Sequence, residues 1–521
     1  MFLWIHTHLD RHPVVRQAIL WSVPALLLGA VLRLLFLGYM PYAYWGSDSS
    51  SYFSFTYQLL SRGDISLDEK RRYVYPLLML PLSLLPGAPL RWLAWLQHGL
   101  GLATLIPLAY VVRRSLVHWK LWVVPVTVLY AGMPILLWYE HELLGEAFFF
   151  AALLWAFAGW VAWVKAEHPE RARQLFWWFF VPLALFFLTK PAGRFVWPGV
   201  LVGLLVVVAW RRLTRPQIGA LAALLLITPT VGSKKQGAWL LYVAAFPLTR
   251  LDTPLHAAYK AEIRDLVEPL RHSIDAYYGL DDHPFAFLEK TTREPNRPLW
   301  VALEKKPKQK AQLYMDLALE GIRADPLLFL YLGSQRVIAS SNLGQFKEKR
   351  FTSGSYPERL TNDYEEAVDD PRSTVRLAFA LPWDAPLPPY SEFQKRLAPH
   401  PDSWMERTFL AWVRAYENAS DLVRMPEKGP KHERGIGLAK ITPLGAWLLA
   451  GIGLAVLLPA YRTTLGVWTV IALGYLAGVF LVSQVNPRYF APAWAVLVPL
   501  LAVPADTAAQ LITRALRRPP S

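Results

Sequence analysis

Stretches of mostly apolar residues recur along this chain, and more polar segments separate them. A helix needs about 20 such residues to cross the roughly 30 Å hydrocarbon core of a bilayer. Only helices and closed barrels satisfy every backbone group in lipid, and continuous apolar runs of this length are typical of helices. The sequence therefore predicts ten membrane spans, near residues 17–39, 91–112, 120–138, 144–164, 175–189, 195–210, 217–232, 441–460, 464–483 and 490–512.

Two further apolar stretches, at 50–60 and 73–85, are rich in aromatic residues and leucine but are too short to span. Such lengths favour helices that lie in the plane of the membrane interface. The alternative is that they are parts of a span that the pattern interrupts. Both belong to the region 40–90, which is expected to form the first external loop.

The predicted spans divide the chain into three regions. Residues 1–232 form an N-terminal transmembrane region of about seven spans, and residues 439–521 form a C-terminal region of about three spans with a basic tail. The polar segment 233–438 between them is expected to be an external domain. Its clearest helical pattern, 308–323, ends before Asp325-Pro326, because proline disfavours helix in the residue ahead of it. The predicted fold class is an all-α polytopic membrane protein with interfacial helices and a mainly helical external domain.

Basic residues flank the predicted spans on one side much more than on the other, which identifies that side as the cytoplasm. With ten spans, both chain termini fall on that side. The first span is too long for a signal peptide and lacks a clear small-residue cleavage site, so it is expected to stay as an anchor. The residues behind this orientation are Arg11, Arg16, Arg113, Arg114, Lys120, Arg171, Arg173, Arg211, Arg212, Arg215, Arg462, Arg514, Arg517 and Arg518.

The overall composition adds three points to this picture. The net charge of +15 partly reflects the flanking residues and favours contact with anionic lipid. A nucleic-acid partner is not expected, because the sequence shows no basic patch on a recognisable nucleic-acid-binding fold. The chain has no Cys, which excludes disulfides and thiolate chemistry and is compatible with an oxidising exterior.

Ionisable residues gather at the predicted outer ends of the spans, where such residues usually have a partner or a function. Asp48 follows the first span, and the apolar pattern after it closes on Gly63-Asp64. A carboxylate in this position can act as a general base, and cations can bind a phosphate. The pattern therefore indicates a site for an anionic, lipid-attached substrate. Its other candidate members are Lys70, Arg71, Arg72, Glu140, His141, Glu142, Glu146, Lys190, Arg194 and Arg488.

Each candidate also has a structural interpretation, which the sequence leaves open. Asp48 can simply cap the helix that begins at Ser49. The glutamates can be solvated loop charges, and the cations can reach lipid headgroups with their long side chains. Residues 140–142 include metal-ligand types, but no further cluster of ligands accompanies them. Sequence motifs for a phosphate-binding lysine loop, a serine nucleophile or a dinucleotide are not found.

The first external loop resembles that of the GT-C superfamily of membrane glycosyltransferases, family 39 in particular. That family groups protein O-mannosyltransferases with the bacterial transferases that put aminoarabinose on lipid A. The residues that carry the resemblance are Asp48, Tyr52, Leu59-Leu60 and Gly63-Asp64, which match the family pattern at the same offsets. Later stretches similar to family blocks lie at 70–78, 97–114, 142–163, 188–208 and 486–492, whereas the segment 233–438 is not matched.

The resemblance implies a hexosyl- or pentosyltransferase that takes its sugar from a polyprenyl phosphate. The acceptor would be a hydroxyl of a glycan, lipid or protein, and Asp48 would be the general base of an inverting transfer. No cofactor is implied, and Ser49 argues against a divalent-metal requirement, because many relatives carry a second acid at that position. The implied setting is the cell envelope, with the protein in a bacterial inner membrane and its active site facing the periplasm.

The resemblance also implies roles for the other candidate residues. The donor phosphate would be bound by Lys70, Arg71, Arg72, Lys190, Arg194 and Arg488. The acceptor or the sugar would be bound by Tyr52, Glu140, Glu142 and Tyr489.

Two other functions remain open at this point. A secondary transporter usually places its ionisable groups near the bilayer midplane and often contains internal repeats. Here the charges gather at the outer ends of the spans, and the sequence shows no repeat. A non-catalytic scaffold for envelope assembly would tolerate replacement of Asp48.

Overall fold

Helices make up almost all of the secondary structure in the computed structural model of this chain. The structure describes residues 13–46, 49–64, 74–206, 213–230, 238, 241–242, 245, 248–272, 311–327, 329–330, 333–334, 337, 351–353, 364, 374–381, 386–420, 423–424, 440–482 and 487–516. In this part of the chain the strands are the two-residue β1 (Val423–Arg424) and β2 (Lys440–Ile441), which pair antiparallel. The predicted all-α class is confirmed.

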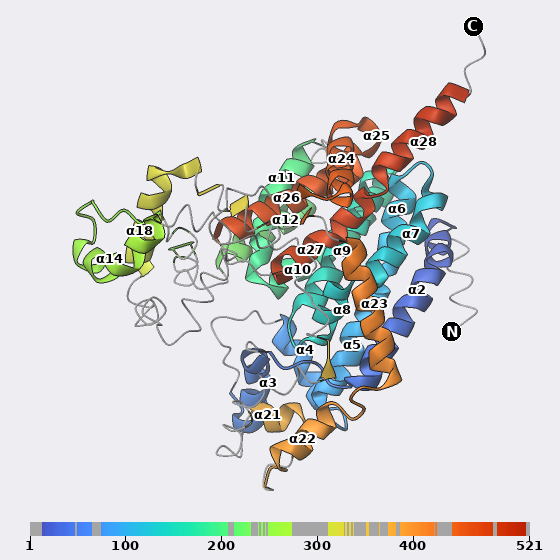
Figure 1. The fold of residues 1–521 in the computed structure, drawn as a ribbon. Helices are drawn as coiled ribbons and strands as arrows, with labels where there is room; N and C mark the ends of the chain where they lie inside the picture. The colour runs from blue at the N-terminus through green and yellow to red at the C-terminus, as the bar shows by residue number, and fades with distance from the viewer. Residues whose placement is uncertain are drawn as a thin grey trace.

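The N-terminal region is a succession of helices joined by short connections (Figure 1). They are α2 (Pro13–Tyr39), α3 (Ser49–Arg62), α4 (Val74–Ser83), α5 (Pro89–Ala103), α6 (Leu105–Ser115), α7 (Trp119–Ala131), α8 (Pro134–His141), α9 (Glu146–Val164), α10 (Pro169–Thr189), the 3₁₀ helix η1 (Pro191–Val196), α11 (Trp197–Val206) and α12 (Arg215–Thr230).

The middle and C-terminal regions complete the described helices. The middle region contributes α14 (Ala257–His272), α18 (Ala311–Ala324), α21 (Thr374–Ala378), α22 (Tyr390–Leu397) and α23 (Trp404–Ser420). The C-terminal region contributes α24 (Pro443–Leu457), α25 (Pro459–Tyr461), the π-helix η7 (Arg462–Gly466), α26 (Val467–Val482), α27 (Pro487–Leu500) and α28 (Val503–Leu516).

Six of the described helical segments are long and apolar enough to cross a bilayer. A seventh results if α7 and α8, which are bent by 49° relative to each other, form one broken span. The bend falls at Met133, whose extended backbone is the conformation expected ahead of Pro134. The same effect ends α24 at Leu457, because Leu458 is extended ahead of Pro459.

The ten predicted spans all coincide with helices, but three of these helices, as far as the structure describes them, are shorter than the roughly 20 residues that a span needs. They are α11 with 10 residues, α12 with 16 and α24 with 15. The two short amphipathic stretches predicted after the first span form α3 and α4. Helix α18 ends at Ala324, just before Asp325-Pro326, as predicted.

Helix α9 lies at the centre of the bundle and α2 at its edge. In α9, 78% of the most apolar window is buried, against 33% in α2, whose exposed side presents leucines and valines as a lipid-facing helix does. Helices α9 and α10 pack at Gly159, where an added Cβ would lie 2.4 Å from the carbonyl oxygen of Trp178. A small residue therefore permits this close approach, as is common between membrane helices.

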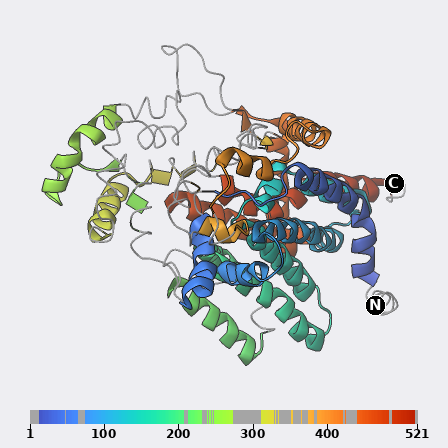
Figure 2. The ribbon, with the colours of Figure 1, turned by 90° about the horizontal axis from the view of Figure 1, so that it is seen from below.

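The middle region divides between two locations. Helices α14 and α18 lie to one side of the bundle in both views (Figures 1 and 2) and share a separate small core around Tyr242, Tyr259 and Tyr314. Helix α23 instead packs along α2 and α7. Trp412 Nε1 donates to the carbonyl oxygen of Gly132 at 2.8 Å, and Phe409 stacks on Phe36 with ring centroids 4.8 Å apart. Part of the segment predicted to be external thus packs against two helices of the N-terminal bundle.

At the end of the bundle where α2 begins, a buried carboxylate joins the N- and C-terminal regions. Asp506 of α28 accepts hydrogen bonds from the backbone N–H groups of Val117 and His118, at 3.1 and 2.8 Å. It also accepts from Tyr461 Oη at 2.8 Å and from Gln510 Nε2 at 3.0 Å. The connection between α6 and α7 is therefore held against α28.

Candidate functional site

The site lies at the opposite end of the bundle, where α2 ends and the chain turns toward α3. The segment that follows α2 runs beside the connection between α8 and α9. Tyr44 N–H donates to the carbonyl oxygen of His141 at 2.6 Å, and Leu143 N–H donates to that of Tyr44 at 2.8 Å. These two bonds form a parallel bridge between Tyr44 and Glu142. Ala43 N–H adds a third bond, to Leu90 O at 3.1 Å, so the segment is held from two sides.

The two described residues on either side of Ser47-Asp48 also lie against this connection. Ser49 Oγ accepts from Gly46 N–H at 2.8 Å and lies 3.4 Å from the carbonyl oxygen of Leu143, to which it donates. A Cβ on Gly46 would lie 2.7 Å from Oε1 of Glu142, so the absence of a side chain at Gly46 lets the chain pass this close to the carboxylate in its present position. The other carboxylate oxygen, Oε2, accepts from Trp138 Nε1 at 3.0 Å.

Gln97 of α5 binds the same connection from the other side. Its Nε2 donates to the carbonyl oxygens of Glu140 and Glu142, each at 2.9 Å. Its Oε1 accepts from the hydroxyl of Tyr75 at 2.6 Å. Gln97 is fully buried, and these three bonds involve both polar atoms of its carboxamide.

Tyr75 of α4 links this network to a buried ion pair. Its ring packs edge-on against Tyr52 of α3, with centroids 5.1 Å apart. On its other side lies Gly145, next to Glu146, whose carboxylate forms an ion pair with Lys190. Burial raises the pKa of Tyr75 well above its ordinary value, and the nearby Tyr52, Glu146 and Glu142 raise the pKa further. The phenol therefore stays protonated and is the donor toward Gln97.

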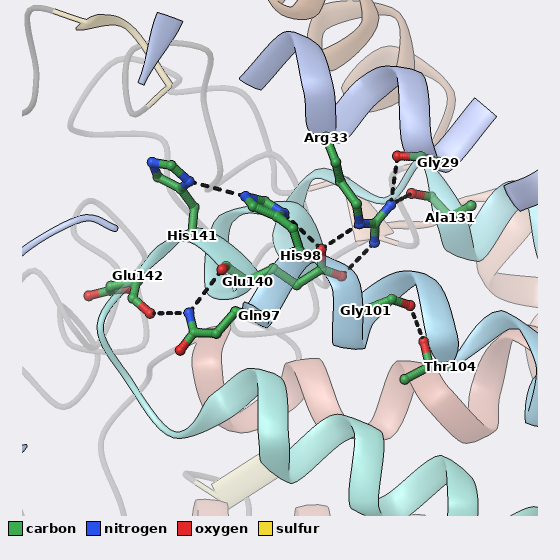
Figure 3. A network of polar contacts seen from close by, with 10 residues as sticks. All are labelled: Gly29, Arg33, Gln97, His98, Gly101, Thr104, Ala131, Glu140, His141 and Glu142. Atoms are coloured by element: carbon green, nitrogen blue, oxygen red, sulfur yellow. Dashed lines mark hydrogen bonds and ion pairs between the residues drawn. The ribbon is translucent and has the colours of Figure 1, made fainter. Parts of the chain in front are cut away.

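A second chain of polar contacts runs through the bundle behind these residues (Figure 3). The guanidinium of Arg33, in α2, binds both carboxylate oxygens of Glu140, with Nη2–Oε1 at 2.6 Å and Nε–Oε2 at 2.7 Å. Its Nη1 donates to the carbonyl oxygen of Gly29 at 3.1 Å. His98 Nδ1 lies 3.1 Å from Glu140 Oε2, and its Nε2 lies 3.1 Å from Nδ1 of His141.

This second chain changes the interpretation of Glu140. The sequence indicated that Glu140 binds the sugar or the acceptor, but both of its carboxylate oxygens are engaged by Arg33 and His98, and all three side chains are buried. A Cβ on Gly101 would lie 2.0 Å from Glu140 Oε1, so the carboxylate is also tightly enclosed. In these contacts Glu140 links the end of α8 to α2 and α5, and its role in binding the sugar or the acceptor stays a prediction.

Among the predicted site residues, the structure places Tyr52 and Glu142 near Tyr75, and Lys190 is joined to the same region through Glu146. Of these, Glu142 lies against Gly46, which precedes Ser47-Asp48. The predicted site residues that lie outside the described residues are Asp48, Lys70, Arg71 and Arg72. Arg194 lies in η1, and Arg488 and Tyr489 lie in α27, but their side chains are outside the described part of the structure. Within the described residues, no group of three or more His, Asp or Glu side chains is placed to hold a metal ion.

Four residues of the site were not identified as candidates from the sequence, namely Arg33, Tyr75, Gln97 and His98. A signal was available for two of them. Arg33 and His98 are charged or titratable residues inside apolar runs, where such groups usually have a partner or a function. Gln97 carries no charge, and its role depends on contacts with residues more than 40 positions away.

Comparison with known proteins gives a single weak likeness to report. No protein-family model matches the sequence, and no curated protein matches it. A structure search finds the crystal structure of ArnT from Cupriavidus metallidurans bound to undecaprenyl phosphate. The identity is 14%, the alignment covers 96% of this chain and 81% of the other, and the TM-score is 0.33. A TM-score this low does not establish that the two chains share a fold.

Proposed function

We propose that this protein is an integral-membrane glycosyltransferase of the GT-C type, which transfers a sugar from a polyprenyl phosphate to an acceptor hydroxyl. The observation that carries the proposal is the gathering of Tyr52, Glu142 and Lys190 at one end of the bundle. These residues come from three distant parts of the sequence. Glu142 lies against Gly46, and Tyr52 follows Ser49 in α3 and packs on Tyr75. Lys190 joins the same region through its ion pair with Glu146, which follows Gly145 beside Tyr75.

In this proposal Asp48 is the general base. The acceptor oxygen attacks the anomeric carbon while its proton passes to the Asp48 carboxylate. The bond between the anomeric carbon and the phosphate oxygen breaks, and polyprenyl phosphate leaves with the bonding electrons. Attack opposite the leaving group inverts the anomeric configuration. The leaving phosphate needs no general acid, but nearby cations stabilise its charge.

The cations proposed for that role are those that the resemblance names. Lys190 is the described member of this set, and it is buried in an ion pair with Glu146. In this proposal its ammonium group binds the phosphate, and the ion pair with Glu146 holds it in place. The remaining proposed cations are Lys70, Arg71, Arg72, Arg194 and Arg488.

Glu142 and Tyr52 are proposed to bind the sugar or the acceptor, together with Tyr489. A bacterial inner membrane, with this end of the bundle toward the periplasm, is the proposed location. This orientation places the basic residues that flank the spans on the cytoplasmic side.

The decisive experiment is release of polyprenyl phosphate from a panel of polyprenyl-phosphate sugars by purified protein, with wild type beside Asp48→Asn. Loss of a general base typically lowers the rate by roughly 10²–10⁴-fold, so Asp48→Asn should lose at least about two orders of magnitude. The control is Asp316→Asn, an identical change on α18 away from the site, which should release at the wild-type rate. If Asp48→Asn releases polyprenyl phosphate at the wild-type rate, Asp48 is not the general base.

One observation favours a second function, that of a proton-coupled transporter. Arg33, Glu140 and His98 form a chain of ionisable groups buried inside the helical bundle, and such groups mark proton or substrate paths in transporters. Proteoliposomes that hold a pH-sensitive dye distinguish the two functions. A proton flux that depends on Glu140, with no polyprenyl phosphate released from any donor, would favour the transporter.

A further inference from the structure

We infer that Gln97 is a positioning residue for the proposed sugar transfer. Its carboxamide holds the backbone of the connection between α8 and α9, which contains Glu142 and lies beside the residues that flank Asp48. This inference rests on the proposed function. Helices α3 and α4 separate Gln97 from Asp48 in the sequence, and the side chain of Gln97 binds two backbone carbonyls and a phenol.

The orientation of the Gln97 carboxamide is determined by its partners. Nε2 carries two hydrogens and faces two carbonyl oxygens, while Oε1 faces the hydroxyl of Tyr75. The reverse orientation would place Oε1 against two other acceptors and remove the donor that Gln97 gives to each carbonyl; the Glu142 carbonyl would keep the bond from Leu144 N–H, at 2.7 Å. Because Tyr75 is protonated, its hydroxyl can donate to only one of the two atoms. The side chain therefore has one satisfied orientation.

The backbone between Glu140 and Glu142 is bound on both sides. The carbonyls of residues 140 and 142 point to Gln97, and the carbonyl of His141 between them accepts from Tyr44 N–H. Glu140 and His141 are the last residues of α8, and Glu142 is the extended residue that follows, so these carbonyls lie where the hydrogen bonds of the helix stop and other donors are needed. Gln97 thus provides the hydrogen-bond donor on one side of this segment, and the backbone N–H of Tyr44, in the chain that leads to Asp48, provides the donor on the other side.

The residues held by this arrangement are those that the proposed chemistry needs. The Glu142 carboxylate lies against Gly46, and Ser49 is hydrogen-bonded to Gly46 and directed to Leu143. If Gln97 loses its amide, the carbonyls of residues 140 and 142 lose their donors on one side. The connection between α8 and α9 can then move, and with it the residues on both sides of Asp48. A displacement of about 1 Å at a reacting group can lower the rate about 10²-fold.

Gln97→Leu tests this inference, because leucine has a similar size but no amide. Turnover of polyprenyl-phosphate sugar should fall by about 10- to 100-fold, with little change in the KM for the donor. The matched control is Gln217→Leu. Gln217 is also buried, and its carboxamide also bonds two backbone groups, those of Thr214 and Arg173, near the start of α10. The control should keep the wild-type turnover; an equal loss in both variants would indicate general destabilisation and would overturn the inference.

A double-mutant cycle with Asp48→Asn separates positioning from a merely structural role. If Gln97 acts by placing Asp48, then Gln97→Leu should have no further effect on the residual turnover of Asp48→Asn. The same fold-loss in both backgrounds would overturn the inference. Tyr75→Phe provides a second variant if Gln97→Leu fails to insert. It removes the hydrogen bond to Oε1 and leaves the two bonds from Nε2, so it should lower turnover in the same direction but by less.

The outcomes for the inference and for the proposed function are distinct. Release that does not need Asp48 overturns the proposed function, whatever Gln97 does. Release that needs Asp48 but is unchanged in Gln97→Leu and in Tyr75→Phe overturns the inference alone.

Discussion

Glu140 and Asp506 lie at opposite ends of the bundle, and each is a buried carboxylate with a histidine Nδ1 at 3.1 Å. Their other partners differ in kind. Glu140 is bound by the guanidinium of Arg33 through two hydrogen bonds. Asp506 is bound by two backbone N–H groups, a tyrosine hydroxyl and a glutamine amide, all of which are neutral donors.

The difference between these two carboxylates shows how a buried negative charge can serve two purposes. Neutral donors stabilise the anion of Asp506 without a second buried charge, and they come from three separate elements that the carboxylate joins. At Glu140 the stabilisation depends on a second buried charge, so neither partner is satisfied alone. Asp506 therefore stabilises the contact between three elements of the fold. Glu140 instead depends on Arg33 for its charge compensation, and the chain that follows Glu140 enters the candidate site.

The largest expected effect on stability is that of Glu140→Leu. This change leaves the Arg33 guanidinium buried without its counter-charge, and breaking a buried ion pair in this way typically costs about 3–5 kcal/mol. Chemical or thermal unfolding of the full chain in detergent measures the loss.

The double variant Arg33→Met with Glu140→Leu sharpens that test. Replacing both members of a buried ion pair by apolar residues is often neutral or even stabilising by about 1–4 kcal/mol. The double variant should therefore be more stable than Glu140→Leu alone. If both are destabilised equally, the isolated charge is not the cause, and enclosure by Gly101 and its neighbours becomes the better explanation.

Asp506→Asn should have the next largest effect. The Asn NH₂ group would face donors in place of an acceptor oxygen, and a buried donor left unsatisfied costs about 1–3 kcal/mol. The same unfolding measurement applies, with Thr513→Val as the control, since the Thr513 hydroxyl bonds only within its own helix, to Ala509 O at 2.8 Å. Folded Asp506→Asn should still release polyprenyl phosphate at the wild-type rate. A loss of stability as large as that of Glu140→Leu would contradict the distinction between the two carboxylates.

The comparison also shows which features the sequence could provide. Apolar runs located every helix of the bundle, and proline positions account for the bend at Met133 and the end of α24. The hydrophobic pattern could not predict the lengths of the individual helices, because several apolar runs are divided by a proline into two helices. Nor could it show that α23, which is amphipathic and follows a polar region, packs along α2 and α7.

The candidate site was predictable in its residue types but not in its pairings. Glu140 and Glu142 look equivalent in the sequence, two positions apart in one turn. In the structure the carboxylate of Glu140 points inward to Arg33, 107 residues away (Figure 3). The carboxylate of Glu142 instead lies against Gly46. Side chains two positions apart at the end of a helix point in different directions, so the two carboxylates must have different surroundings. Which residue each carboxylate meets depends on tertiary packing.

The smallest expected effect on stability is that of breaking a third carboxylate–histidine pair, between Asp316 and His256. This pair lies at the small core beside the bundle. Its atoms are 3.0 Å apart, about as close as those of the other two pairs, but both side chains are 29% exposed. The hydrogen bond from His256 lowers the pKa of Asp316, and Gln312 adds to this. Because the folded-state pKa is depressed, the carboxylate contributes stability above the ordinary Asp value of about 3.9 and loses it as the pH falls through the folded value.

Hydrogen–deuterium exchange of the full chain, corrected for the intrinsic rate at each pH, measures this effect in peptides of α18. Wild-type protection should decrease on the acid side of about pH 4, and Asp316→Asn should remove that decrease and match wild type at the lowest pH. The effect should be small, since water competes for an exposed pair. The three histidine–carboxylate distances differ by only 0.1 Å, so burial and charge compensation, not proximity, must rank the three pairs. An Asp316→Asn effect as large as that of Glu140→Leu would contradict that ranking.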